Sequence, residues 1–84
     1  MVAHKPIISK HALERLVRYL AHLKTLPATE GANISATAIA EALELNQVQV
    51  RKDLAAVSSG GKPKTGYVLA DLITAIERFL NYDN

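Results

Sequence analysis

The apolar residues in the first third of the chain recur at helical spacing. Residues three or four positions apart share one face of a helix. Four leucines follow that spacing: Leu13, Leu16, Leu20 and Leu23. Ser9 is a preferred N-cap and Pro27 a helix breaker. The pattern predicts a helix from Ser9 to about Leu26, with Arg15 and Tyr19 on one shoulder of the buried stripe.

A second, Ala-rich helix is predicted after a loop at residues 28–33. Ser35 is its N-cap, and Ile39 and Leu43 are spaced to face the core. We expect this helix to end at about Glu44.

A third helix is predicted at residues 46–57, with Asn46 as its N-cap. One face is apolar and consists of Val50, Leu54 and Val57. Only Leu45 separates Asn46 from the end of the second helix. Two helices joined by so short a turn cross steeply, which is the helix-turn-helix geometry.

The last third of the chain combines turn residues, lysines and a final amphipathic helix. Residues 58–61, Ser-Ser-Gly-Gly, end the third helix, and residues 60–68 predict a small basic hairpin. A helix is predicted from Leu69 to about Tyr82. Its apolar stripe is wider than one core contact needs and comprises Leu69, Leu72, Ile73, Ile76, Phe79 and Leu80.

This order of elements predicts a mainly α fold, a winged helix-turn-helix with a three-helix core, a basic β-hairpin wing and a C-terminal helix. The 84 residues fit a single domain, 1–84, with residues 1–8 as a mobile leader. With no cysteine, disulfides and thiolate metal sites are excluded. No apolar run approaches the length that spans a membrane, so we expect a cytoplasmic protein.

The charges are segregated along the chain although the net charge is only +2. Basic residues dominate residues 1–24 and 47–67, whereas acidic residues dominate residues 25–46 and 68–84. Such segregation is typical of a domain with one nucleic-acid face, so we expect double-stranded DNA as the partner.

In this interpretation the helix at 46–57 enters the major groove, and the wing at 60–68 contacts the DNA backbone or the minor groove. The glutamine amides suit adenine, the valine a thymine methyl, and the cations bases or phosphates. Arg15 on the first helix adds a backbone contact. The predicted DNA-binding residues are Gln47, Val48, Gln49, Arg51, Lys52, Lys62, Lys64 and Arg15.

Asp53 does not fit a DNA-facing helix, because a carboxylate repels phosphate. On the helical wheel it lies toward the core. We expect it to pair with a cation inside the domain, such as Arg15, rather than to contact a cytosine.

No catalytic or metal site is predicted. The histidines, His4, His11 and His22, have no carboxylate at ligand spacing and are expected on the surface. The serines have no His and acid partners at recognisable spacing. We therefore expect a protein that is not an enzyme.

Specific motifs now point to a family. Residues 49–54, Gln-Val-Arg-Lys-Asp-Leu, are followed by the pairs Gly61-Lys62 and Gly66-Tyr67 and then a Leu-rich helix. With Arg15-Leu16 and Tyr19 in the first helix, this resembles the N-terminal DNA-binding domain of the bacterial redox-sensing repressor Rex. The string from Val50 to Leu54 alone is also similar to other winged-helix repressors.

The resemblance implies a homodimeric repressor that binds a palindromic operator and is released when NADH binds a C-terminal Rossmann domain. We expect that domain to lie outside this chain, which stops at Asn84, about where the domain would begin. We therefore expect no cofactor in this chain, with NADH or NAD bound only by the missing domain.

The chain departs from the family pattern at several positions. Residues 55–58, Ala-Ala-Val-Ser, stand where the family has an aromatic pair and a glycine. Pro63 and Lys64 change the wing, and Val68 replaces an Asn that would cap the last helix. An alternative function is a winged-helix protein-interaction or dimerisation module that uses the wide stripe of the last helix and does not bind DNA.

Overall fold

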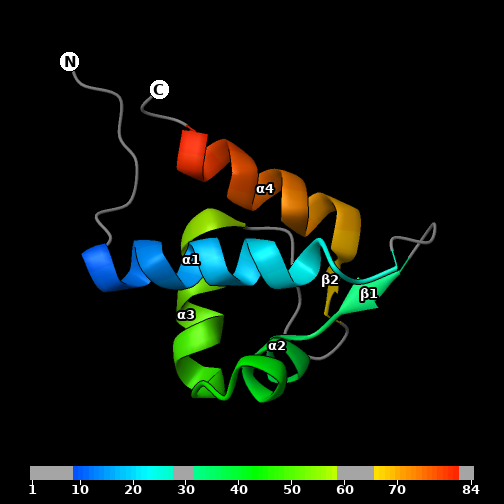
Figure 1. Ribbon diagram of the computed structural model, residues 1–84, viewed down its shortest axis with the longest axis horizontal. Coiled ribbons are helices and arrows are strands. Elements are labelled where there is room, and N and C mark those ends of the chain that lie inside the picture. Colours follow the sequence, from blue (N-terminus) through cyan, green and yellow to red (C-terminus); the bar gives the residue numbers. More distant parts are fainter. Residues whose placement is uncertain (1–8, 28–31, 59–65, 82–84) are drawn as a thin grey trace.

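The computed structural model describes residues 9–27, 32–58 and 66–81 of the chain. The elements of this part are α1 (Lys10–Leu23), β1 (Asn33–Ile34), α2 (Ala36–Leu43), α3 (Gln47–Val57), β2 (Tyr67–Val68) and α4 (Leu69–Asn81) (Figure 1). This mainly helical order with a small antiparallel sheet confirms the predicted winged helix-turn-helix class. The predicted leader, residues 1–8, lies outside the described residues.

The three predicted N-caps are confirmed. The side chain of Ser9 accepts a hydrogen bond from the backbone N–H of Ala12 (3.1 Å), and that of Ser35 accepts one from Ala38 (3.0 Å). The side chain of Asn46 accepts from the backbone of both Val48 and Gln49, at 2.8 and 3.2 Å. Each cap satisfies backbone donors that lack a partner within the helix, so short polar residues fix where the helices begin.

The first helix ends at Leu23, not at about Leu26 as predicted. Beyond Leu23 two backbone hydrogen bonds join residues three positions apart. The N–H of Thr25 donates to the carbonyl of His22 (2.9 Å), and the N–H of Leu26 donates to the carbonyl of Leu23 (3.2 Å). The hydroxyl of Thr25 also donates to the His22 carbonyl, at 2.6 Å. The chain therefore remains coiled for one more turn, but in the narrower form common at helix ends.

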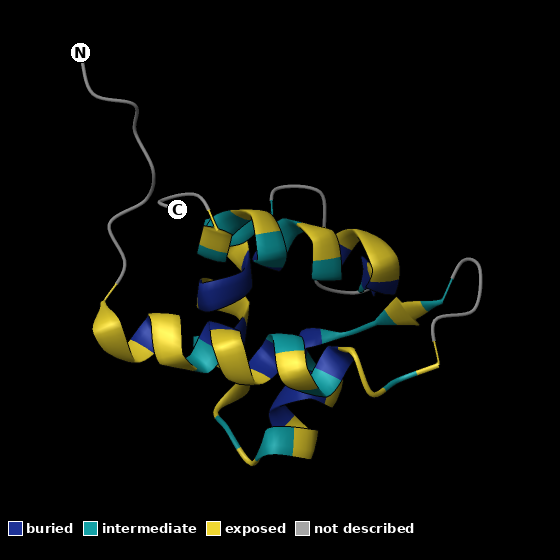
Figure 2. Ribbon diagram, turned by 45° about the horizontal axis from the view of Figure 1, so that its top comes forward, coloured by how far each residue is buried: buried dark blue, intermediate teal, exposed yellow. Residues whose placement is uncertain are grey.

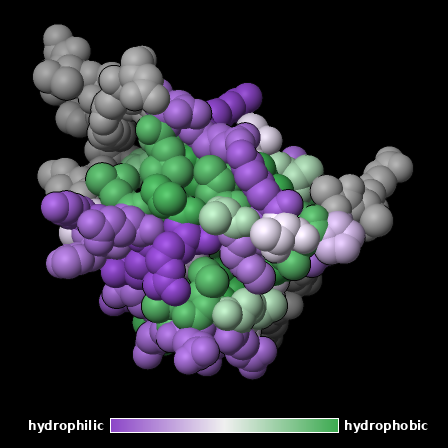
Figure 3. Space-filling model, in the orientation of Figure 1, coloured by the Kyte–Doolittle hydropathy of each residue, from purple (hydrophilic) through white to green (hydrophobic). Residues whose placement is uncertain are grey.

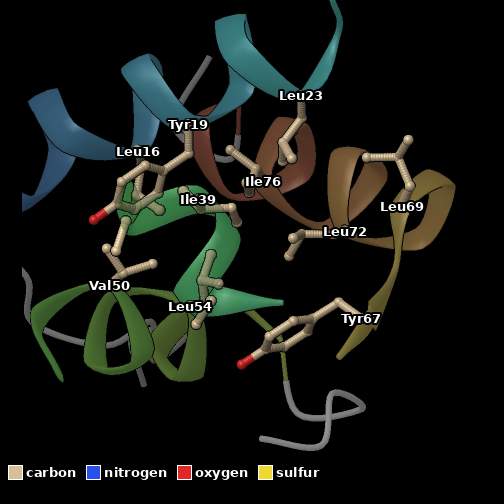
Figure 4. Packing of buried hydrophobic residues seen from close by; sticks show 12 residues of the cluster. Leu16, Tyr19, Leu23, Ile39, Val50, Leu54, Tyr67, Leu69, Leu72 and Ile76 are labelled. Atoms are coloured by element: carbon tan, nitrogen blue, oxygen red, sulfur yellow. The ribbon is translucent and has the colours of Figure 1, made fainter. Parts of the chain in front are cut away.

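The core lies where the four helices face one another, and buried residues line their inner sides (Figure 2). Figure 4 shows side chains from all of these helices meeting in one cluster. Its fully buried members are Leu16, Tyr19, Leu23, Ile39, Val50, Leu54, Leu72 and Ile76. Each such aliphatic side chain stabilises the fold by about 1.5 to 3 kcal/mol.

The buried stripe of α1 is rotated relative to the prediction. Leu13 is 37% exposed, whereas Tyr19, predicted on a shoulder, is completely buried. The observed stripe is Ala12, Leu16, Tyr19 and Leu23. Its spacing is equally helical, so periodicity alone did not distinguish the two. In Figure 4 the ring of Tyr19 packs in the cluster with its hydroxyl at the edge.

The turn between α2 and α3 contains a left-handed residue. Glu44, with φ 57° and ψ 48°, follows the last residue of α2. The backbone N–H of Leu45 donates back to the carbonyl of Ala40 at 2.8 Å, which is the bond of a Schellman motif. The motif turns the chain sharply, so Figure 1 views α2 nearly end-on while α3 runs upright.

The small sheet joins segments that are far apart in sequence. Strands β1 and β2 are antiparallel, with Asn33 opposite Val68 and Ile34 opposite Tyr67. The predicted loop at residues 28–33 is therefore wrong at Asn33. Tyr67 and Val68 are extended as expected, but their partner among the described residues is β1. The proposed wing tip, residues 59–65, lies outside the described residues.

Position 66, directly before β2, requires a glycine for two reasons. Its φ is 87°, a conformation that L side chains rarely adopt. A Cβ atom there would stand 2.7 Å from the carbonyl oxygen of Ile34. The glycine therefore lets the chain approach β1 closely enough to form the sheet.

Candidate nucleic-acid interface

The N-cap, the apolar face and the neighbouring helices position α3. Val50 and Leu54 are fully buried against the core, and Val57 is half-buried. The opposite side carries Gln47, Val48, Arg51 and Lys52, all exposed. The structure thus brings four of the predicted DNA-contacting residues together on the surface of one helix. The fifth, Gln49, is half-buried.

The boundary between these two sides of α3 is occupied by Asp53, which is only 3% exposed. Arg15 on α1 holds it through two hydrogen bonds, Nε to Oδ2 at 2.6 Å and Nη2 to Oδ1 at 3.0 Å. The hydroxyl of Tyr19 also donates to Oδ2, and Nε2 of Gln49 donates to Oδ1 at 3.0 Å. The predicted pairing of Asp53 with Arg15 is confirmed.

Charge and burial act against each other in this cluster. Burial by itself raises the pKa of the Asp53 carboxyl, but hydrogen bonds from Arg15, Tyr19 and Gln49 outweigh it and hold the pKa below its ordinary value. The hydrogen bond to Asp53 raises the pKa of the Arg15 guanidinium. Burial, and then the bond to Asp53, raises the pKa of Tyr19. At neutral pH the cluster therefore consists of a carboxylate, a guanidinium and a protonated phenol.

The cluster attaches α3 to α1 and removes one anion from the prospective DNA face. A bidentate pair between a guanidinium and a carboxylate fixes orientation as well as distance. Because Arg15 neutralises Asp53 inside the domain, Arg51 and Lys52 are left to set the charge of the exposed side of α3.

Arg18, another cation of α1, lies close to the helix-turn-helix unit. Arg18 donates to the carbonyl of Leu43 at the end of α2 (3.4 Å), where a cation also complements the helix dipole. Arg15 and Lys52 line a shallow surface hollow between the first turn of α1 and the middle of α3. Of the remaining predicted contacts, Lys62 and Lys64 lie outside the described residues.

Sequence reasoning missed two contributors. Tyr19 was placed on a shoulder of α1, although its spacing from Leu16 and Leu23 also allowed burial. Thr37 on α2 was not considered, yet its hydroxyl bonds to Oε1 of Gln47 at 2.8 Å. No sequence signal identified Thr37, because the contact depends on how α2 and α3 pack.

The described residues contain no cluster of histidines and carboxylates able to hold a metal ion. His11 lies 3.7 Å from Glu14 on the same exposed helix face, and His22 is half-buried. None of the helices in the described part is long and apolar enough to cross a membrane.

Comparison with known protein families shows the family of this chain. The family described as "Putative DNA-binding protein N-terminus" matches residues 7–55, more than half of the chain. The chain belongs to this family. Together with the Rex relatives described next, this membership confirms the resemblance drawn from the motif around Arg51.

Similar curated proteins carry one name, the redox-sensing transcriptional repressor Rex. Rex of Treponema denticola is 44% identical over 98% of this chain and 39% of its own length. Rex of Brevibacillus brevis is 35% identical over 95% of this chain and 38% of its own length. Rex of Porphyromonas gingivalis is 33% identical over 89% of this chain and 34% of its own length.

The chain therefore spans between a third and two fifths of the length of these relatives. The solved structures contain no significant match to it.

The wide apolar stripe of α4, the basis of the alternative interaction module, is partly used inside the domain. Leu69, Leu72 and Ile76 are buried, so they are not available on the surface for docking a partner. Ile73 and Leu80 are half-buried and pack against the core. Figure 3 shows apolar surface over the region where α4 meets α1.

Proposed function

We propose that this chain is a sequence-specific DNA-binding domain of a Rex-type transcriptional repressor, with α3 as the recognition helix in the major groove. The observation that carries the proposal is the two-sided anchoring of α3. Its apolar side and Asp53 are fixed to the core, while Gln47, Arg51 and Lys52 stay exposed. A rigid helix with amides and cations at its first turns is the form that reads base edges.

The assembly around the domain is proposed from the same resemblance. We place the protein in the cytoplasm as a homodimer on a palindromic operator, since a twofold pair of recognition helices requires two matching half-sites. Lys62 and Lys64 would contact phosphate or the minor groove. NADH would bind a C-terminal Rossmann domain, not the residues of this chain, and the role is regulatory rather than enzymatic.

The test begins with selection of bound duplexes from a random pool. Titration of a selected duplex and a scrambled duplex at several salt concentrations should give tighter binding to the selected one. Affinity should fall steeply with salt, because phosphate contacts release counterions. Equal affinity for both duplexes would contradict sequence-specific binding, and salt-independent affinity would contradict phosphate contact.

A pair of arginine variants locates the interface. Arg51→Ala, on α3, should weaken binding by about 1 to 3 kcal/mol if Arg51 reads a base. Arg78→Ala, on the exposed side of α4, makes the same change in charge away from α3. Its affinity should stay within about 0.5 kcal/mol of wild type. Equal losses for the two variants would place the DNA elsewhere.

A further inference from the structure

The amide of Gln49 has a fixed polarity in this structure. An Asn or Gln amide carries an acceptor oxygen and a donor NH₂, and only its hydrogen bonds tell which end lies where. The end that faces Asp53 is 3.0 Å from Oδ1. An ionised carboxylate only accepts hydrogen bonds, so the end facing it must be Nε2.

Asp53 cannot turn to accommodate the opposite arrangement. Oδ1 also accepts from Nη2 of Arg15 at 3.0 Å, and Oδ2 accepts from Nε of Arg15 and the hydroxyl of Tyr19. Every donor but Gln49 comes from α1, and Asp53 is buried. The carboxylate is thus a rigid anchor for the amide.

The consequence is that Oε1 of Gln49 points away from the anchor. No residue in the described part of the chain donates to it. Gln49 is the third residue of α3, in the first turn after the Asn46 cap. Residues at the start of a recognition helix are those that reach base edges.

We propose that Asp53 is a positioning residue that makes Gln49 a hydrogen-bond acceptor toward DNA, selecting a base with an exocyclic amino group in the major groove. The candidates are adenine through N6 and cytosine through N4. Guanine and thymine present only acceptors at the corresponding positions, so the outward oxygen rejects them. The inference rests on the proposed function and deepens it.

Gln47 shows why the anchor matters. Its Oε1 lies 2.8 Å from the hydroxyl of Thr37. A hydroxyl can donate or accept, so the amide of Gln47 can turn over and keep a hydrogen bond. Gln47 can therefore offer either a donor or an acceptor, whereas Gln49 offers its oxygen.

The experiment uses duplexes selected by the wild-type chain, with single bases replaced by analogues. Purine in place of adenine and 2-pyrimidinone in place of cytosine remove the amino group. The 7-deaza analogues of adenine and guanine remove the N7 acceptor. Each duplex is titrated with wild type and with Gln49→Ala, so that effects on the duplex itself cancel in the comparison.

At one position, removal of the amino group should weaken wild-type binding by about tenfold more than it weakens binding of Gln49→Ala. A loss that depends on Gln49 but appears only when an acceptor is removed would overturn the proposal. So would the absence of any position at which Gln49 matters. Failure of the proposed function looks different, because wild type would then not distinguish selected from scrambled duplexes.

Asp53→Asn tests the positioning role. An asparagine can present either an oxygen or an NH₂ to Gln49, so the amide is released. The variant should lose the amino-group preference, while its affinity for scrambled DNA does not fall, because loss of the carboxylate leaves the Arg15 cation without its neutralising partner. A merely structural role would lower affinity for every duplex alike and leave the preference in place. If this variant does not fold, the wild-type analogue series still decides the proposal.

Discussion

The guanidinium of Arg15 on α1 holds the carboxylate of Asp53 on α3 through two hydrogen bonds, of 2.6 and 3.0 Å. The two residues are 38 positions apart, and this pair joins the first helix of the domain to the prospective recognition helix. The carboxylate is buried, while the Arg15 side chain is 22% exposed. Removing the cation therefore leaves a buried charge with only neutral donors.

Arg15→Ala should destabilise the domain by about 3 to 5 kcal/mol, the usual cost of leaving one buried partner of an ion pair uncompensated. Urea unfolding followed by circular dichroism measures it. Arg18→Ala is the matched control, because Arg18 is exposed on the same helix and makes one long bond of 3.4 Å. Its cost should stay below about 1 kcal/mol. Similar losses of unfolding free energy for both variants would show that the ion pair with Asp53 contributes no more than an exposed contact.

The low pKa of Asp53 predicts how acid acts on stability. Folding favours the ionised form, so this contribution is fully present above about pH 5 and is lost as the pH falls below about 4, through the folded-state pKa. Asp53→Asn lacks the titrating group. The stability difference between wild type and this variant should therefore shrink between pH 7 and pH 3. A difference in unfolding free energy between the two proteins that stays constant over that pH range would contradict the prediction.

Gly66→Ala should destabilise the domain by at least about 2 kcal/mol. A positive φ costs an L residue about 1 to 2 kcal/mol, and the new Cβ would meet the Ile34 carbonyl oxygen at 2.7 Å. Thermal unfolding measures the change. Ser58→Ala, at the end of α3 where φ is −140°, is a control for alanine in a connecting segment and should change stability by less than about 0.5 kcal/mol. A neutral Gly66→Ala would mean that β1 and β2 separate at little cost.

Glu44→Gly should stabilise the domain by about 0.5 to 1 kcal/mol. Glycine adopts the left-handed conformation of Glu44 without strain, and the substitution removes a carboxylate from the negative end of α2. The control is Glu41→Gly within α2, which is exposed as well. There glycine should destabilise by about 1 kcal/mol. The urea midpoints of the two variants should thus move in opposite directions from wild type.

Features that depend on neighbours a few residues away could be predicted from the amino-acid sequence. Ser9, Ser35 and Asn46 cap their helices because a side-chain oxygen reaches backbone N–H groups two or three residues on. The short turn at Glu44 makes α2 and α3 cross at a steep angle. The motif around Arg51 pointed to the family, and the charge of Asp53 on a DNA-facing helix pointed to an internal partner.

Which residues distant in sequence meet one another depends on how the whole domain packs. Strand β1 could not be predicted from local pattern, since its partners Tyr67 and Val68 lie far along the chain. Helical periodicity allowed two stripes on α1, and packing against the other helices chose the one that buries Tyr19. Likewise, the polarity of the Gln49 amide depends on Asp53, which α1 holds in place. Local hydrogen bonds fix where elements begin and end, whereas burial and pairing depend on surfaces brought together by the whole fold.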